Sequence, residues 1–573
     1  MYTLGINAAF HDPAACLVRD GEVVAAAEEE RFTRIKHGKR PVPFSTWELP
    51  FHAIDFCLSR ANITLEQVDH VAYSFDPAQQ LGDRMTDATI AIPLNPASYP
   101  FAASQDAPWD PLFLSHILNA PRQLVDGPPL HLRARFENAV WDGPFQWHFV
   151  DHHEAHAASA FLASPFERAA ILCLDGRGER ATTSYWIGDG ASLKGLGHVA
   201  LPHSLGLLYE QVTEYLGFLR SSDEYKVMAL ASYGAPRYVD DFRRLVRVGK
   251  NGDYSIAPAD LAARFGPPRA HGGPVDQRHF DLARSLQVVL EETTLCLARW
   301  LREATDSPHL CMAGGVALNC VLNARLRDAR IFDHVWVQPA AGDAGTALGA
   351  ALLVDAEARR ASSHWHMEHA YLGPAYSDDE IERLLRSSRL SYHRSSDVAA
   401  DSARMLAVNK IIGWFQGNME FGPRALGARS ILASPIDPEM QAKLNEIKDR
   451  EDFRPVAPVV REEDAGDWFD GADCAPFMLF TFPVRSERAQ LVPAVRHVDG
   501  TARVQTIRRE QNPRYYDLVH AFGKATGVPV LVNTSFNTRG RPIVCTPRDA
   551  LESFWTSPLD ALAIGSFILE KSR

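Results

Sequence analysis

The sequence lacks any block of lysine or arginine residues. Its 573 residues include 59 basic and 71 acidic side chains, which gives a formal net charge of −12 at pH 7. A protein whose main partner is long nucleic acid needs a basic face to neutralise phosphates. The composition therefore predicts no nucleic-acid partner, although a local arginine cluster would still serve a small anionic substrate.

Long apolar runs and paired cysteines are also missing. No segment reaches about eighteen consecutive apolar residues, and residues 1–6 do not form a charged and then apolar leader. These absences predict a cytoplasmic protein with no membrane partner. The eight cysteines form no CxxC pair, so a disulfide framework or a structural zinc site is not expected, and we interpret them as buried thiols.

The length is too great for a single core, and a repeated pattern suggests how the chain is divided. Segment 4–27 has the pattern of a strand, a polar loop, a strand, an Asp-Gly turn and a returning strand. A second segment that begins at Ala169 repeats this order, with its polar loop at 175–179. The recurrence suggests an internal duplication, which is how the actin-like ATPase fold is built. Chance recurrence is the alternative, because hairpins are common.

A histidine pair marks the most distinctive candidate site. His152 and His156 stand four residues apart at the start of an alanine-rich run. A helix would stack both imidazoles on one face, about 6 Å apart, which suits a shared metal ion. His153 would point elsewhere, and the pattern is not the HExxH motif of zinc proteases. Ordinary core or capping histidines are the alternative, because 22 histidines are spread over the chain.

Three glycine-rich junctions can present backbone N–H groups to phosphate oxygens. The first is the loop 175–179, which alone is a weak signal. In the second, Gly314 and Gly315 follow a predicted strand at 310–312. The third spans 342–350 and contains Asp343, whose simplest role is to cap the helix that begins there.

The composition changes after Ala350. Residues 357–369 are predicted to form a linker, followed by a helix at 377–389 and a strand at 411–415. The densest arginine chemistry of the chain comes next. Guanidinium groups fit phosphate and carboxylate oxygens in pairs. Several of these bases have acids beside them in sequence, so a surface ion-pair network is the alternative.

Short motifs spread over almost the whole chain resemble those of the NodU/CmcH family of O-carbamoyltransferases, a group that includes enzymes of aminoglycoside tailoring. No single motif is decisive, but their order is specific. The resemblance implies an α/β protein with a duplicated actin-like ATPase (TsaD-like) domain at residues 1–360 and an α/β YrdC-like domain at 361–573. The motifs lie at 11–15, 28–32, 152–159, 175–179, 224–228, 314–319, 342–346, 417–430, 453–458 and 533–537.

The same resemblance implies an activity in two steps. The YrdC-like domain would make carbamoyl adenylate from carbamoyl phosphate and ATP, with Mg²⁺ accompanying the nucleotide. The TsaD-like domain would hold this intermediate beside a metal, expected to be Fe(II), and pass the carbamoyl group to a hydroxyl of a small-molecule acceptor. The expected acceptor is a natural product such as a macrocycle, its glycoside or an aminoglycoside. A homodimer is possible.

Residue roles follow from the positions that match the family motifs. His11 and Asp12 are candidates for the general base, and His11 is equally a candidate to bind substrate by a hydrogen bond. Lys448 and Arg454 are expected to act in catalysis at the carbamoyl phosphate site. The metal ligands would be His152, His156 and Asp343; the cofactor contacts Gly176, Glu224, Lys226, Gly314, Gly315 and Asn319; and the other residues of the carbamoyl phosphate site Arg503, Asn533 and Ser535, with Arg424 and Arg429 as neighbours.

Two rival functions remain open. One is a threonylcarbamoyl-adenylate-forming tRNA modification enzyme, which the acidic net charge disfavours. The other is an actin-like ATP-binding scaffold or kinase, which would leave the arginine cluster unexplained. One segment, 81–143, matches no family motif and is expected to cover the acceptor cleft. Its apolar residues would favour a lipophilic acceptor; they include Phe101, Trp109, Phe113 and Leu114.

Overall fold

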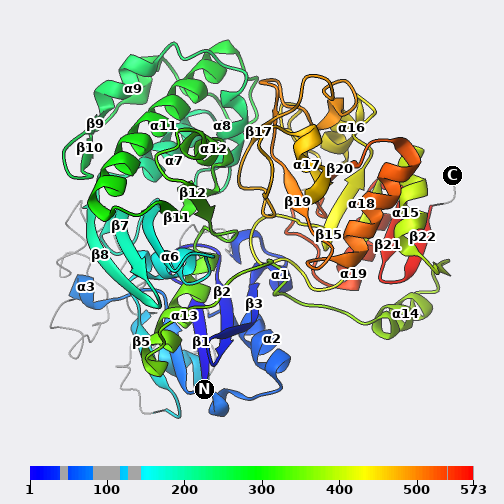
Figure 1. Ribbon diagram of the computed structural model, residues 1–573, viewed down its shortest axis with the longest axis horizontal. Helices are drawn as coiled ribbons and strands as arrows, with labels where there is room; N and C mark the ends of the chain where they lie inside the picture. The colour runs from blue at the N-terminus through cyan, green and yellow to red at the C-terminus, as the bar shows by residue number, and fades with distance from the viewer. Residues whose placement is uncertain (39–48, 82–116, 127–142, 539, 572–573) are drawn as a thin grey trace.

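Two five-stranded sheets with the same strand order form the core of the N-terminal part of the protein (Figure 1). The computed structural model describes residues 1–38, 49–81, 117–126, 143–538 and 540–571. The first sheet has the order β3-β2-β1-β4-β5, with β1 (Tyr2–Asn7), β2 (Ala14–Arg19), β3 (Glu22–Glu28), β4 (His70–Tyr73) and β5 (Gln146–Phe149). The second has the order β8-β7-β6-β11-β12, with β6 (Arg168–Leu174), β7 (Ala181–Asp189), β8 (Ser192–Ala200), β11 (His309–Ala313) and β12 (His334–Val337).

The two sheets share their pairing as well as their order. In each, the first three strands form an antiparallel meander, and the last two strands join in parallel. Gly21 and Gly190, at the two Asp-Gly turns, have positive φ angles of 91° and 59°, which glycine adopts without a steric penalty. The predicted internal duplication is therefore confirmed, and the fold class is mixed α/β.

Two helices pack against each other between the sheets. α6 (His152–Phe161) follows β5 of the first sheet but contacts β6 and β11 of the second. α13 (Ala344–Arg359) follows β12 of the second sheet but contacts β1, β2 and β4 of the first. A Cβ at Gly349 would lie 1.9 Å from the carbonyl oxygen of Ala155, so the two helix backbones meet directly. This close packing brings the N-terminal ends of both helices to one place.

A helical region covers the outer end of the second sheet (Figure 1). Its longest helix is α11 (Gln277–Thr305), and the side chain of Asp276 caps its first turn. The other elements of this region are α7 (Leu205–Tyr215), α8 (Glu224–Ala231), α9 (Val239–Leu245), β9 (Val246–Val248), β10 (Tyr254–Ile256), α10 (Leu261–Phe265), the short helix η6 (Gly315–Leu318) and α12 (Cys320–Asp328). Around the first sheet lie α1 (Glu30–Thr33), η1 (Lys36–Gly38), α2 (Phe51–Ala61), η2 (Leu65–Gln67), α3 (Ala78–Leu81) and α5 (Ala120–Asp126).

An eight-stranded mixed sheet forms the C-terminal part, in the order β13-β22-β21-β14-β15-β20-β16-β19. Its strands are β13 (His393–Arg394), β14 (Ile412–Phe415), β15 (Arg429–Ala433), β16 (Ala457–Arg461), β19 (Gln505–Ile507), β20 (Val530–Ser535), β21 (Ala561–Ile564) and β22 (Phe567–Glu570). The remaining elements are α14 (Asp378–Ser387), α15 (Val398–Ala407), α16 (Met440–Ile447), α17 (Glu462–Trp468), β17 (Phe482–Pro483), η7 (Pro493–Val495), β18 (Thr501–Ala502), α18 (Pro513–Thr526) and α19 (Pro547–Trp555).

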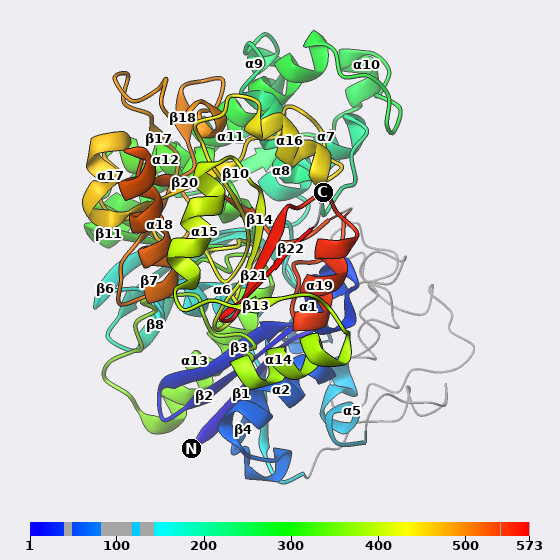
Figure 2. The same cartoon turned by 90° about the vertical axis from the view of Figure 1, so that its right-hand side faces the viewer.

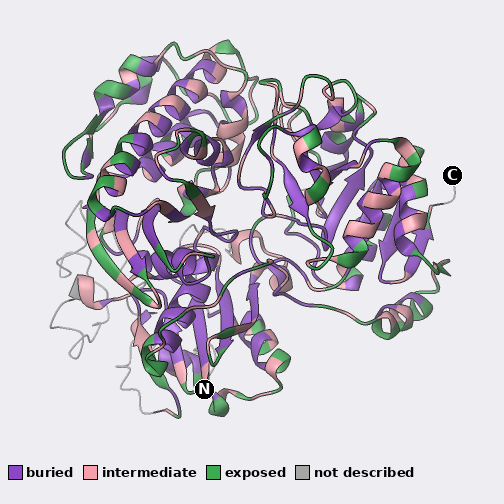
Figure 3. Cartoon of the chain, in the orientation of Figure 1, coloured by how far each residue is buried: buried purple, intermediate pink, exposed green. Residues whose placement is uncertain are grey.

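Apolar cores cover both faces of this sheet. On one face, α15 and α18 lie side by side and pack over alternate strand residues such as Trp414 (Figure 2). On the other face, α16, α17 and α19 pack over residues such as Phe415. The central strands are consequently buried along their length (Figure 3). Burial on both faces explains why these strands are continuous apolar runs rather than alternating ones.

The smaller predictions for this region agree with the structure, with one correction. The predicted linker contains the last residues of α13 and then irregular chain, and the predicted helix and strand are α14 and β14. All eight cysteines are free thiols, but Cys296 and Cys474 are exposed, so the expectation that all are buried is wrong for these two. Among the described residues, no helix combines the length and apolarity needed to span a bilayer.

A buried ion pair of the N-terminal part binds the backbone of the C-terminal part. Arg31 pairs with Glu28 at 3.0 Å and also donates a hydrogen bond to the carbonyl oxygen of Gly422. Glu28 in turn accepts a hydrogen bond from the backbone N–H of Gly422. The pair therefore binds both sides of one backbone position, and that position is two residues before Arg424.

Candidate functional site

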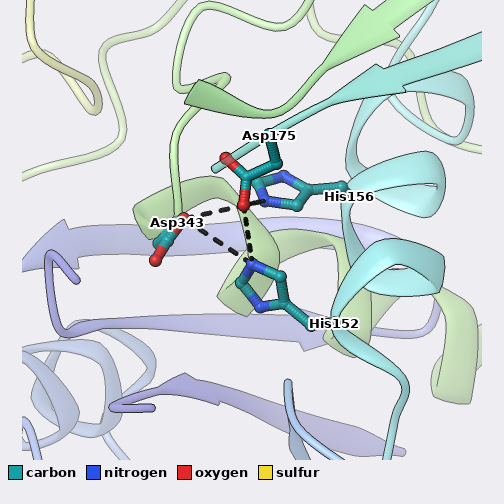
Figure 4. A group of neighbouring side chains, drawn as sticks. All are labelled: His152, His156, Asp175 and Asp343. Carbon is teal, nitrogen blue, oxygen red and sulfur yellow. Dashed lines mark ion pairs between the residues drawn. The ribbon is translucent and has the colours of Figure 1, made fainter. Parts of the chain in front are cut away.

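Four ligand-type side chains meet where the two central helices begin (Figure 4). His152 and His156 project from α6, Asp175 follows β6, and Asp343 immediately precedes α13. Their potential donor atoms all lie within 4.8 Å of one another, and all four residues are buried. The structure thus brings together the three predicted metal ligands, and it adds Asp175.

The local sequence explains why these side chains point inward. Asp151 caps α6 by accepting a hydrogen bond from the backbone N–H of Glu154, so the helix begins at His152. His153 points elsewhere, as predicted, and its Nδ1 lies 2.9 Å from Ser184 Oγ. Asp343 occupies the cap position of α13, but its side chain makes no capping hydrogen bond. The simple capping role is therefore not the one that this carboxylate performs.

The distances within the group suit a shared cation better than direct hydrogen bonds. His152 Nε2 lies 3.4 Å from Asp175 Oδ2 and 3.7 Å from Asp343 Oδ1. The corresponding distances from His156 Nε2 are 3.8 and 3.7 Å. Neither Nε2 atom has a hydrogen-bond partner within the described ranges. Tetrahedral ligands at about 2.1 Å from a metal are separated by about 3.4 Å, so the spacing fits a divalent ion.

The electrostatics agree with this interpretation. Burial alone would lower the pKa of His156, but the carboxylates of Asp175 and Asp343 raise it to about 9. Burial alone would raise the pKa of Asp175, but His152 and His156 hold it well below its ordinary value. Two carboxylate oxygens facing two imidazoles form a donor set that suits a divalent metal ion.

A glycine turn connects this group to the rest of the molecule. The backbone N–H of Gly315 donates a hydrogen bond of 2.8 Å to Asp175 Oδ1. Gly314 has a φ of 92°, and a Cβ there would lie 2.2 Å from the carbonyl oxygen of Leu174, so only glycine fits. Gly176 lies on the adjacent loop. Asn319 caps α12 and exchanges hydrogen bonds with Gln287, so its amide is already engaged within the protein.

The predicted general-base residues lie in a second polar group. Nδ1 of His11 and Nδ1 of His37 each lie 2.8 Å from a different oxygen of Asp12. Sequence reasoning missed His37. Its only signal was a place close after the predicted motif at 28–32, and nothing in that spacing indicates a contact with the loop between β1 and β2.

Five basic residues of the C-terminal part gather near α8. Nε of Arg424, Nη2 of Arg450 and Nε of Arg503 are buried atoms without a hydrogen-bond partner in the described part of the chain. Burial and the neighbouring Arg503 lower the pKa of Arg424 to about 9. Burial, and to a smaller extent the positive charges of Arg454 and Arg503, lower the pKa of Arg450 to about 9. We call this set the basic cluster; it consists of Arg424, Lys448, Arg450, Arg454 and Arg503.

Acidic partners are few around the basic cluster. Glu451 lies 2.9 Å from Lys226 and 3.7 Å from Arg454. The guanidinium of Arg454 also stacks 4.6 Å from the centre of the Tyr225 ring. Over the described residues, Arg424, Arg450 and Arg503 form no ion pair, so the surface ion-pair alternative does not describe them. Sequence reasoning missed Arg450 as a member, although it stands between two predicted residues.

Some of the other predicted residues lie near the basic cluster, and one lies away from it. Lys448 donates hydrogen bonds to Oγ of Ser535 and to Asn537. Asn533 is buried two residues before Ser535 on β20 and donates a hydrogen bond to Gln505. By contrast, Arg429 lies in the core, where it donates to the carbonyl oxygens of Gln416 and Pro374. The structure does not bring Arg429 to the basic cluster.

Glu224 and Lys226 lie on α8. This helix stands between the group of His11, Asp12 and His37 and the basic cluster. Glu224 accepts a hydrogen bond from the backbone N–H of Ser221, and burial raises its pKa to about 7. Lys226 is held by Asp223 and Glu451. The segment expected to shape acceptor choice, with Phe101, Trp109, Phe113 and Leu114, lies almost entirely outside the described residues.

Comparison with known proteins agrees with the motifs. The Carbamoyltransferase N-terminus family matches residues 2–89 and 143–352, and the Carbamoyltransferase C-terminus family matches residues 403–571. An uncharacterised protein of Synechocystis is 40% identical over the whole of this chain and 97% of its own length. The nodulation protein NolNO of Sinorhizobium fredii is 40% identical over 99% of this chain and 80% of its own length.

Solved structures are more distant. HypF in its phosphate- and nucleotide-bound form is 12% identical, with a TM-score of 0.32 over 62% of this chain and 55% of HypF, which is too low to support an argument. The family matches cover most of the sequence, in the order that the motifs predicted. The chain therefore belongs to the carbamoyltransferase family and is a carbamoyltransferase.

Proposed function

We propose that the protein is an ATP-dependent O-carbamoyltransferase that works through two connected sites. In the basic cluster, carbamoyl phosphate and water would give carbamate and phosphate, and the carbamate oxygen would attack the α-phosphate of ATP. Carbamoyl adenylate forms and pyrophosphate leaves. The second site consists of His152, His156, Asp175 and Asp343, and we call it the His-Asp group. There the carbamoyl group is then transferred to an alcohol oxygen, and AMP leaves.

The observation that carries the first step is the uncompensated charge of the basic cluster. Burying a cation without a partner is costly, so these guanidinium groups are stabilised when an anion binds among them. Carbamoyl phosphate brings about two negative charges, and attack on a phosphate builds more. Arg424, Arg450 and Arg503 each offer a buried N–H group for such an anion. Arg454 contributes further positive charge at the same place, and Lys448 binds Ser535 and Asn537 beside it.

The second step is supported by the donor set of the His-Asp group. His152, His156, Asp175 and Asp343 would hold a divalent ion, with Fe(II) as our proposal for its identity. Such an ion supplies Lewis acidity to a carbonyl or phosphoryl oxygen. The protein itself orients the ligands, since the packing of α6 on α13 and the hydrogen bond between Asp175 and Gly315 fix their positions.

One short turn contacts both sites, which supports a direct passage between them. η6 begins at Gly315, which is bonded to Asp175. It ends at Leu318, whose carbonyl oxygen lies 3.4 Å from Nη2 of Arg424. We propose that Gly176, Gly314 and Gly315 approach the nucleotide here, with Glu224 and Lys226 on α8 beside it. Carbamoyl adenylate made in the basic cluster would then need to cross only this turn.

The finer fold and cellular assignments are part of the same proposal. The duplicated sheets with exchanged helices support an actin-like, TsaD-like domain at residues 1–360. The mixed eight-stranded sheet would be the YrdC-like domain, at residues 361–573. ATP and carbamoyl phosphate are cytoplasmic metabolites, which supports a cytoplasmic enzyme. A homodimer would be tested by light scattering.

The decisive experiment measures the two steps separately. Purified protein with ATP, Mg²⁺ and carbamoyl phosphate should release pyrophosphate only when all three are present. A panel of hydroxylated natural products should then be screened by mass spectrometry for the gain of one carbamoyl group. Chelation of the transition metal should stop the gain but leave pyrophosphate release. If no pyrophosphate is released, the adenylate route is wrong; if transfer requires tRNA, the tRNA modification enzyme is the better description.

A further inference from the structure

A hydroxyl, an imidazole and a carboxylate form a connected series beside the proposed transfer site. Ser222 Oγ lies 3.0 Å from Nε2 of His37, and Nδ1 of His37 lies 2.8 Å from Asp12 Oδ1. The three residues come from the turn before α8, from η1, and from the loop between β1 and β2. This is the order of groups by which many enzymes activate a hydroxyl.

His11 occupies the other side of Asp12, but its hydrogen bonds give it a different role. Its Nδ1 lies 2.8 Å from Asp12 Oδ2, and its Nε2 lies 2.7 Å from the carbonyl oxygen of Ser221. A carboxylate and a carbonyl oxygen only accept hydrogen bonds. In this arrangement both ring nitrogens of His11 face acceptor atoms rather than a hydroxyl group.

His37 differs because one of its partners can donate. Nδ1 donates to Asp12, which fixes the tautomer, and Nε2 is left with a lone pair that faces the hydroxyl of Ser222. Burial lowers the pKa of His37 below its ordinary value even though Asp12 opposes this effect, so the ring is neutral near pH 7. Its other charged or titratable neighbours are His11, Lys36, and Glu30, which accepts from the backbone N–H of His37.

The backbone around this series is strained. Asp12, His37 and Ser221 have φ angles of 44°, 61° and 56°, in the left-handed region that residues other than glycine rarely adopt. Such strain persists where the surrounding structure determines the conformation, and it gathers at functional sites. Three left-handed residues from three separate segments meet here around one hydrogen-bonded series.

The series lies next to the proposed transfer site. Phe10, the residue before His11, packs its ring edge to face on His152 with 4.8 Å between the ring centres. Ser221 Oγ donates to Glu210, and Oε1 of Glu210 would lie 3.2 Å from a Cβ placed at Gly176. The residues next to the series, Phe10 and Ser221, therefore connect it to the His-Asp group and to the first glycine loop.

We infer that His37 is the general base of the transfer step, that Ser222 relays the proton, and that Asp12 is the positioning residue for the ring. The inference rests on the proposed function. As the acceptor oxygen bonds to the carbamoyl carbon, its proton passes to Ser222 Oγ, and the Ser222 proton passes to Nε2 of His37. The bond from that carbon to the adenylate oxygen breaks, and AMP leaves with the electron pair. Asp12 stabilises the imidazolium that results, and His11 holds Asp12 in place.

The test compares His37→Asn and Ser222→Ala in the full-length, metal-loaded protein, with His393→Asn as a control at an exposed histidine. Asparagine keeps a donor toward Asp12 but has no basic nitrogen. Three rates are measured: pyrophosphate release, carbamoylation of the best alcohol from the panel, and formation of hydroxyurea from added hydroxylamine. Hydroxylamine attacks as a neutral amine, so it needs no base to remove a proton beforehand.

We expect H37N to keep pyrophosphate release and hydroxyurea formation within about twofold of wild type, and to lose alcohol carbamoylation by about 100-fold or more. S222A should also lose alcohol carbamoylation selectively, by about tenfold or more. Unchanged alcohol transfer in H37N, or equal losses in all three rates, would overturn the inference. A carbamoyl group found covalently on Ser222 would overturn it too, because Ser222 would then be a nucleophile. If wild type makes no pyrophosphate, it is the proposed function that has failed.

Discussion

Oδ1 of Asp175 accepts a hydrogen bond of 2.8 Å from the backbone N–H of Gly315, a residue 140 positions further along the chain. The other oxygen of the same carboxylate faces His152 Nε2 at 3.4 Å. A shift of the turn that begins at Gly315 must therefore move one of the four ligand-type groups. Arg424 contacts the other end of that turn, so one short turn touches both the basic cluster and the His-Asp group.

Replacement of Asp175 by asparagine should weaken metal binding without unfolding the turn. The amide oxygen can still accept the hydrogen bond from Gly315, but the negative charge that faces the imidazoles is lost. We expect metal affinity to fall by about 10- to 100-fold. Metal titration followed by elemental analysis measures this, with Asp189→Asn, in an exposed hairpin turn, as the control. Full metal occupancy in D175N at limiting metal would exclude Asp175 as a ligand.

Arg450→Gln tests a member of the basic cluster that the motifs did not single out. Nη2 of Arg450 is buried without a partner among the described residues, so it can donate a hydrogen bond to a bound anion. We expect the KM for carbamoyl phosphate in pyrophosphate release to rise by about tenfold or more, corresponding to a hydrogen bond with a charged group. Arg509→Gln, at a side chain that is 63% exposed, is the matched control. Equal KM values for both variants would remove Arg450 from the site.

Glu224 should make stability depend on pH. Burial raises its pKa to about 7, so between about pH 4.5 and 7 the folded protein keeps a proton that the unfolded chain has lost. The contribution of this group to stability is therefore complete at low pH and is lost as the pH rises through 7. Glu224→Gln should flatten this part of the pH dependence of the thermal midpoint, whereas Glu214→Gln, at an exposed side chain, should not. Identical slopes for wild type and E224Q would contradict the burial effect.

Arg31→Met should loosen the junction between the two parts of the chain. Removal of this guanidinium leaves the buried carboxylate of Glu28 without its cation, and such a change costs about 3–5 kcal/mol. Gly422 also loses a hydrogen bond to its carbonyl oxygen, so the segment that carries Arg424 becomes less fixed. We expect a lower thermal midpoint together with a raised KM for carbamoyl phosphate. Arg31→Lys should not restore both, because an ammonium group cannot reproduce the forked contact.

Gly314→Ala should disrupt the glycine turn. A φ of 92° disfavours alanine, and the added Cβ would lie 2.2 Å from the carbonyl oxygen of Leu174. The turn must shift, and Gly315 shifts with it away from Asp175. We expect weaker ATP binding and weaker metal binding, measured by titration calorimetry. Gly272→Ala is the control, because that glycine also has a positive φ but would place its Cβ in open space. Wild-type affinities in G314A would show that the turn does not form part of either site.

The sequence by itself determined the local features of this protein. The repeated strand and Asp-Gly turn pattern predicted the duplication, because strand alternation and turn chemistry depend on neighbouring residues. The spacing of His152 and His156 predicted a common helix face for the same reason. The family could be recognised because its motifs keep their order along the chain. The YrdC-like assignment and the roles of the individual site residues remain proposals.

Only the tertiary structure decided which distant residues meet. Asp175, His37 and Arg450 join their groups through contacts that cross sheets or separate segments, and no periodicity in the sequence encodes such contacts. The tertiary structure also directed Arg429 into the core, although it belongs to the same motif as Arg424. Helix packing made the difference, since the approach of α6 to α13 at Gly349 determines which carboxylates face the histidines. Close packing is a property of the whole fold, and it therefore cannot be read from one segment at a time.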